Sequence, residues 1–197
     1  MDAIGSPLST PPSLPSFSSQ HHFYLAVDTL QFKMVTLMDL LGMAAARRPC
    51  LPMVVCCSSR DELDAVCYNI SNLSSYISVS SLHSDLPEAC RVEVLDNFRQ
   101  ATITWNRLAR DEEAEGKAEK EEERKSHLIV VTDACLPLLG SELPVCARIL
   151  INYELPTKKN GIVINMVVGG EEAILKTLEE SISLVIAEMP IHIFEII

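Results

Sequence analysis

Apolar residues in this chain fall into two alternating patterns. The segment Met53–Cys57 is a continuous apolar run, which is typical of a strand buried on both faces. Residues 30–46 instead place apolar side chains at three- and four-residue steps, which predicts an amphipathic helix. The helical positions are Leu30, Met34, Leu37, Met38 and Leu41.

The two patterns continue along the chain and predict an alternating series of elements. Further strands are expected at 23–27, 77–82, 127–131, 147–153 and 162–168. One helix is expected to begin near Asp61, with Ser59 as its cap. A second is expected from Pro87 to about Trp105, and a third after Gly169-Gly170. Inward-facing side chains are predicted at Leu63, Val66, Ile70, Val92, Leu95 and Phe98, and the last helix is predicted to carry Ile174, Leu175 and Leu178 on one face. This alternation predicts the α/β class, with a parallel sheet built from β-α-β units.

Composition divides the 197 residues into one domain with appendages. Residues 1–21 are rich in Ser and Pro and predict a disordered leader, so the domain is expected at 22–197. Residues 106–126 hold eight acidic and six basic side chains and almost nothing apolar. They predict a charged insertion, either a solvated helix or disordered surface segment, or a partner-docking helix. The last segment, 184–197, is apolar with a turn at Met189-Pro190.

Charge and cysteine content narrow the functional classes. A net charge of −11 argues against strong autonomous nucleic-acid binding, since that affinity comes largely from Lys and Arg. The seven cysteines have no C-x-x-C spacing and no matching His pair, so no metal site is predicted. They are expected to act as small core residues in a reducing compartment, the cytoplasm or the nucleus. No apolar run is long enough to predict a membrane span.

Polar residues follow three of the predicted strands. The loops carry Ser58-Ser59-Arg60, His83-Ser84-Asp85 and Thr132-Asp133. Ligands of open α/β sheets bind beyond the carboxyl ends of the strands, and this mixture of hydroxyls, helix starts and one Arg suits a phosphodiester backbone. Each residue also has a purely structural interpretation, as a helix cap, a loop cap or a satisfied loop residue.

Three segments in fixed order carry a family resemblance. They are Leu82-His83-Ser84-Asp85-Leu86-Pro87, Val130-Val131-Thr132-Asp133 and Ile151-Asn152-Tyr153-Glu154-Leu155-Pro156. Together they resemble the C-terminal RecA-like domain of DEAD-box RNA helicases, most of all the eukaryotic initiation factor 4A type. Val54 to Arg60 resembles the family's motif IV, and Glu88 and Arg91 fall on its Gln-x-x-Arg motif, with the Arg kept and the Gln replaced. The resemblance covers residues 22–197.

This resemblance implies a set of RNA-binding residues, none of them catalytic. They are Ser59, Arg60, Ser84, Asp85, Arg91, Thr132 and Asp133. Ser84 stands where the family has a Gly that lets the backbone approach phosphate, so this contact is expected to be crowded. The alternative for Arg91 is an exposed helix residue without a binding role.

The departures from the family concentrate in its catalytic segments. Where motif V has Ala-Arg-Gly-(Leu/Ile)-Asp, the Arg falls at Pro137 and the Asp at Gly140. Where motif VI supplies arginines, only Lys158-Lys159-Asn160-Gly161 lies between Thr157 and Ile162, and Lys does not replace a bidentate Arg fork. The sequence contains neither a G-x-x-x-x-G-K-[ST] loop nor Asp-Glu-Ala-Asp. We therefore expect no bound cofactor, ATP being implied only by the resemblance, and no independent ATPase.

The short segment after Leu155 also affects the fold. One predicted strand ends near Leu155 and the next begins at Ile162, whereas a parallel crossover needs about a dozen or more residues. One of three alternatives is expected: the two strands pair antiparallel, one of them leaves the sheet, or the chain is an incomplete product.

The sequence thus predicts a degenerate C-terminal helicase domain that acts without catalysis in RNA metabolism. It is expected to bind a protein partner, or RNA weakly, and neither a membrane nor a metal. The alternative is a subunit or fragment of an ATP-dependent RNA helicase of the translation initiation factor type, which completes its ATP site with another chain.

Overall fold

A computed structural model describes residues 21–109, 125–135, 147–154, 162–182, 185–191 and 193. Four of the predictions fall mainly or wholly on other residues. The leader and most of the charged segment 106–126 lie outside the described residues. So do Pro137 and Gly140 of the motif V comparison and the segment 155–161 that stands in place of motif VI.

Seven strands form one sheet in which every neighbouring pair is parallel. Along the sheet their order is β3-β4-β2-β5-β6-β1-β7. The strands are β1 His21–Val27, β2 Pro52–Cys57, β3 Ile77–Leu82, β4 Ser126–Thr132, β5 Ile149–Asn152, β6 Ile162–Val168 and β7 Ala187–Glu188. The predicted α/β class with a parallel sheet is confirmed.

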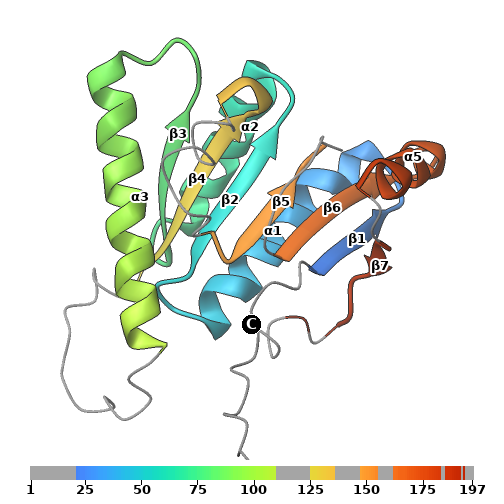
Figure 1. Ribbon diagram of the computed structural model, residues 1–197, viewed down its shortest axis with the longest axis horizontal. Helices are drawn as coiled ribbons and strands as arrows, with labels where there is room; N and C mark the ends of the chain where they lie inside the picture. The colour runs from blue at the N-terminus through green and yellow to red at the C-terminus, as the bar shows by residue number, and fades with distance from the viewer. Residues whose placement is uncertain are drawn as a thin grey trace, which may run out of the picture.

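Helices connect the strands and cover the sheet (Figure 1). The α-helices are α1 Leu30–Arg47, α2 Arg60–Ile70, α3 Glu88–Leu108 and α5 Glu172–Ile182, with short 3-10 turns at Ser71–Leu73 and Asp133–Cys135. Figure 1 shows α1 and α2 on one face of the sheet and α3 on the other. All four predicted helices are present within a few residues of the expected positions.

Strand β2 shows why this sequence needs a layer of helices on each face of the sheet. Its six residues are all buried, and successive side chains point to opposite faces of the sheet. Met53, Val55 and Cys57 pack in the core beneath α1 and α2, which also contains Leu63, Val66 and Ile70. Val54 and Cys56 pack in the second core beneath α3, with Leu95 and Phe98. The continuous apolar run in β2 is therefore explained by two cores that share one strand.

One predicted inward-facing residue points outward. Val92 of α3 is 52% exposed, whereas Leu95 and Phe98 are buried as expected. Val92 lies in the second turn of α3, near the N-terminal end of that helix. In α5, Leu178 is buried, while Ile174, predicted on the same helix face, is 54% exposed. Strand β7 was not predicted, and it pairs with β1 at the edge of the sheet.

Two of the outcomes expected between β5 and β6, antiparallel pairing and departure of one strand from the sheet, are wrong. The two strands pair in parallel, with Ile149 opposite Ile162 and Asn152 opposite Asn165. Because β5 ends at Asn152, nine residues, 153–161, connect the strands. The chain must return by about 10 Å and step about 5 Å sideways, and nine residues reach up to about 30 Å. A short strand therefore removes the need for a crossover helix.

Two negative findings apply to the described part of the chain. None of its helices combines the length and hydropathy required to span a bilayer. No disulfide joins its six cysteines, of which Cys50, Cys56, Cys57 and Cys135 are buried, as expected for small core residues.

Candidate nucleic-acid interface

The predicted loops meet at one edge of the sheet. Strands β3, β4 and β2 are neighbours and parallel, so the segments that follow them emerge side by side. This brings Ser59 and Arg60 at the start of α2 near His83 and Asp85 after β3. Thr132 ends β4 opposite Cys57, and Asp133 follows it. The three polar loops therefore lie at one edge of the sheet.

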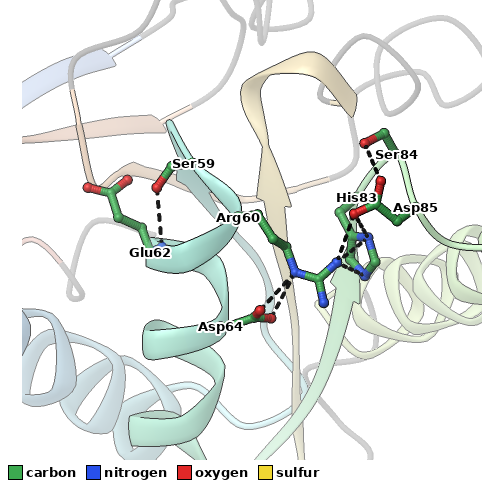
Figure 2. Close-up of polar contacts among 7 residues, drawn as sticks. All are labelled: Ser59, Arg60, Glu62, Asp64, His83, Ser84 and Asp85. Atoms are coloured by element: carbon green, nitrogen blue, oxygen red, sulfur yellow. Dashed lines mark hydrogen bonds and ion pairs between the residues drawn. The ribbon is translucent and has the colours of Figure 1, made fainter.

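Ser59 is the N-cap of α2. Its Oγ accepts a hydrogen bond from the backbone N–H of Glu62 at 3.2 Å, as expected of a cap (Figure 2). The structural interpretation of Ser59 is therefore correct. Its hydroxyl is committed to the helix, and any contact with a ligand adds to that role.

Arg60 is the centre of a polar cluster (Figure 2). Its Nε donates to both carboxylate oxygens of Asp64, one turn further along α2, at 2.9 Å. Its Nη1 lies 2.6 Å from Nδ1 and 2.9 Å from Nε2 of His83, and 3.5 Å from Oδ2 of Asp85. The guanidinium is thus held between two carboxylates and a buried imidazole.

The loop after β3 is internally bonded. Ser84 donates from Oγ to Oδ1 of Asp85 at 3.2 Å, and both side chains are exposed. His83 is buried and contacts Arg60, so it is a satisfied loop residue. Asp85 does not cap α3 through its side chain, because that helix begins after Pro87 without a side-chain cap.

The remaining predicted residues differ in their engagement. Arg91 lies in the first turn of α3, half-buried, and its guanidinium makes no hydrogen bond or ion pair with another described residue. Asp133 accepts a hydrogen bond from Sγ of Cys56 at 2.8 Å, which ties the end of β4 to β2. Thr132 is half-buried at the end of β4. Arg91 is therefore the predicted basic group that is not already paired within the described chain.

A second polar cluster, not predicted from the sequence, lies where β2 and β5 meet. The helix after β2 leads towards β3, whereas β5 leads to β6 on the other side, so this is the point where the strand order reverses. Ser58 donates from its backbone N–H at 3.1 Å and its Oγ at 2.9 Å to Oε2 of Glu62. Glu62 in turn hydrogen-bonds to Glu154, after β5.

The two carboxyl groups shift each other's pKa in opposite directions. Burial and the hydrogen bond to Glu154 raise the pKa of Glu62, while the same hydrogen bond and Ser58 lower the pKa of Glu154. Burial raises the pKa of Cys57 and of Tyr153, and the negative charge of the Glu62–Glu154 pair raises both further. The spacing Ser59-x-x-Glu62 is that of a capping box, which is the sequence signal that would have located Glu62.

Lys33 of α1 contributes a buried positive charge beside this pair. The side chain is only 1% exposed, and Nζ lies 5.1 Å from the centroid of the Tyr153 ring, a cation–π contact. Its charge also lowers the pKa of Glu154. Across the described residues, no group of three His, Cys, Asp or Glu side chains is placed to hold a metal ion.

Comparison with known proteins places this fold. No protein-family model matches the chain. Among curated proteins, it is 24% identical to the ATP-dependent RNA helicase eIF4A of Mycosarcoma maydis over a 191-residue alignment that covers 89% of this chain and 38% of the relative. It is 23% identical to the ATP-dependent RNA helicase fal1 of Schizosaccharomyces pombe, over 89% of this chain and 40% of the relative. The chain thus spans about two fifths of the length of these relatives.

Solved structures agree on the fold. The C-terminal domain of the DEAD-box protein Dbp5 matches with a TM-score of 0.59 at 16% identity, over 89% of this chain and 92% of that domain. Dbp5 of Saccharomyces cerevisiae bound to RNA and ADP BeF3 matches with a TM-score of 0.61 at 12% identity, over 90% of this chain and 43% of that one. The chain has the RecA-like fold of a DEAD-box C-terminal domain and distant sequence similarity to eIF4A.

Proposed function

We propose that this chain is a non-catalytic domain of the DEAD-box C-terminal type that binds single-stranded RNA weakly in RNA metabolism. The observation that carries the proposal is the gathering of Arg60, Arg91 and the loops after β2, β3 and β4 at one edge of the sheet. Dbp5, which shares the fold, has been solved with RNA. The residues proposed to form this RNA-binding edge are Ser59, Arg60, Ser84, Asp85, Arg91, Thr132 and Asp133.

The chemistry of this edge suits a phosphodiester backbone better than a base. Arg60 has five N–H donors, and neither Nη2 hydrogen has a partner among the described residues. The N-terminus of α2 adds a positive partial charge beside the guanidinium. Contacts of this kind position a strand without reading its sequence, so the binding is expected to be sequence-independent.

Two features keep the proposed affinity low. The chain carries a net charge of −11, which repels a polyanion. Arg60 is also already bonded to two carboxylates, so a phosphate must compete for it. We expect a dissociation constant in the range of about 10⁻⁴–10⁻⁶ M, typical of electrostatic binding without base readout.

ATP turnover is not part of the proposal. The motif V Arg and Asp are replaced by Pro137 and Gly140, and Lys158 and Lys159 are the basic residues between Thr157 and Ile162. Loss of an arginine finger typically lowers phosphoryl transfer by about 10³–10⁵. In addition, Glu62 and Glu154 place two carboxyl groups at the point where the strand order reverses, and carboxylates there oppose a triphosphate.

The test is fluorescence anisotropy with a labelled single-stranded RNA at 50 and 200 mM salt. The wild-type chain should lose roughly tenfold in affinity between the two, as expected for two to three phosphate contacts. Arg60→Gln should weaken binding and reduce the salt slope by about 0.7.

The matched control is Arg99→Gln on α3. Arg99 is 40% exposed and Arg60 is 43% exposed, and each makes a 2.9 Å ion pair with an Asp of its own helix. Arg99→Gln should leave the salt slope unchanged. Equal effects of the two substitutions, or binding that does not respond to salt, would contradict the proposed site.

Protein binding is the second function proposed. The C-terminal domain of Dbp5 has been solved bound to Gle1, and the Escherichia coli DEAD-box protein SrmB bound to RraA, and both match this fold. The test is chemical cross-linking followed by reconstitution of any captured complex from purified components. A one-to-one complex that survives gel filtration would support this function, and complexes that never reconstitute would count against it.

The alternative is a part of an active helicase. Supplying an eIF4A-type first domain in trans tests it, because a composite site would release phosphate from ATP in the presence of RNA. Turnover that Arg91→Ala abolishes would establish the alternative and overturn the non-catalytic proposal. Release no faster than with the first domain alone would support the non-catalytic proposal.

A further inference from the structure

Two aspartates compete for the Arg60 guanidinium. Asp64 binds Nε with both of its oxygens at 2.9 Å, and Asp85 approaches Nη1 at 3.5 Å (Figure 2). One positive charge therefore faces two negative charges. Carboxylates occupy the directions from which an oxyanion would have to approach Nε and Nη1, and Nη2 remains as the open part of the fork.

We propose that Asp64 and Asp85 are the residues that set the affinity of this edge for phosphodiesters, by acting as internal competitors for Arg60. The inference rests on the proposed RNA-binding function. It assigns Asp85 a role opposite to the one implied by the family resemblance, namely opposing RNA, and gives Asp64 a role that its sequence position did not indicate.

The competition is possible because both carboxylates can move away. Asp64 is 57% exposed and Asp85 is 72% exposed, so each regains water when Arg60 turns to a phosphate. The imidazole of His83, by contrast, is 9% exposed, and it keeps Arg60 near the loop after β3. A phosphate thus exchanges with exposed carboxylates while the buried contact stays in place.

The two carboxylates should contribute unequally. Asp64 makes the shorter contact, and it lies one turn along the same helix, so it follows Arg60 whatever the loop after β3 does. Asp85 is further away and also accepts a hydrogen bond from Ser84. Removal of the charge on Asp64 should therefore raise the affinity for RNA more than removal of the charge on Asp85.

The test measures RNA affinity at 50 mM salt for Asp64→Asn, Asp85→Asn and the double variant. Each single substitution should tighten binding about two- to fivefold, the scale of an exposed charge pair, with the larger gain for Asp64→Asn. The double variant should exceed either one. Asn is close in shape to Asp, and circular dichroism melting checks that each variant is folded.

Asp96→Asn is the control for the change in net charge. Asp96 forms a 2.9 Å ion pair with Arg99 and is 55% exposed, so it matches Asp64 in contact distance and exposure, but it lies on α3 and does not contact Arg60. It should give a smaller gain than Asp64→Asn. Adding Arg60→Gln to Asp64→Asn should remove the extra gain in affinity, because without Arg60 the charge at position 64 no longer affects a phosphate contact.

The outcomes separate this inference from the proposed function. If binding depends on Arg60 but Asp64→Asn and Asp85→Asn gain no more than Asp96→Asn, the competition is wrong and the proposed function stands. If binding is the same with and without Arg60, or if neither the wild type nor the double variant binds RNA, the proposed function fails and the inference fails with it.

Discussion

At the scale of single residues, side-chain partners decide what each predicted group is free to do. The sequence places Ser59, Arg60 and Asp85 correctly in loops at the carboxyl edge of the sheet. It does not show that Arg60 contacts Asp64, His83 and Asp85 at once, because two of these partners lie more than 20 residues away. Contacts of this kind depend on which loops become neighbours, and that follows from the order of the strands.

The Glu62–Glu154 pair leads to a prediction for stability against pH. The pKa of Glu62 is raised above its ordinary value of 4.5, so this group favours folding while protonated, and its contribution is lost as pH rises from 4.5 through the raised pKa. Glu62→Gln imitates the protonated carboxyl. The variant should unfold at higher urea than the wild type at pH 7, by about 0.5–1 kcal/mol for a partly exposed group.

The lowered pKa of Glu154 gives the opposite dependence, a loss of stability as pH falls below 4.5, and this loss should remain in Glu62→Gln. Lys33, Ser58 and Tyr153 face the pair and are unchanged by the substitution. Urea unfolding at pH 4, 5.5 and 7 measures both effects. Glu93→Gln, an exposed change on α3, is the control, and an equal gain in that variant would argue against a raised pKa of Glu62 as the cause.

At the scale of elements, the start of α2 was the best predicted feature. Ser59 caps the helix as its sequence position indicated. Ser59→Ala should lower the free energy of unfolding by about 1 kcal/mol, because the N–H of Glu62 loses its acceptor. Ser75→Ala, in an exposed turn, should change it by less than half as much. Similar losses from the two substitutions in urea unfolding would argue against the cap.

Among the elements, β5 and its pairing with β6 were predicted least well. The apolar run at 147–153 gives no sign that the strand ends at Asn152, because pairing and not hydropathy determines where it stops. Two buried amides mark the register. Asn152 donates from Nδ2 to Oδ1 of Asn165 at 2.7 Å, and Asn165 donates from Nδ2 to the backbone oxygen of Phe23 at 3.0 Å.

A double-mutant cycle tests this register. Asn165→Val should cost about 1–3 kcal/mol, since it leaves a donor of Asn152 buried without a partner. Asn152→Val combined with Asn165→Val should cost less than the sum of the two single changes, with a coupling of at least about 0.5 kcal/mol. Additive losses in urea unfolding would show that the two amides do not meet and that β6 is not beside β5.

At the scale of the whole molecule, two cores share one sheet, and they should unfold together. The core beneath α1 and α2 includes the single Trp, Trp105, which is 8% exposed. Trp105 fluorescence and circular dichroism should therefore follow one urea transition, with a slope of about 1–3 kcal/mol/M or somewhat steeper for this length. Two separated transitions would show that the short connection between β5 and β6 leaves the halves of the sheet uncoupled.

If the loops after β2, β3 and β4 form one RNA-binding edge, amide chemical-shift mapping during titration with single-stranded RNA should locate it. We expect perturbed amides at 58–60, 83–85 and 132–133, and unperturbed amides along the Asp96–Arg99 segment of α3. Perturbations confined to other regions, or none at RNA concentrations well above 10⁻⁴ M, the upper end of the range for electrostatic binding, would contradict it.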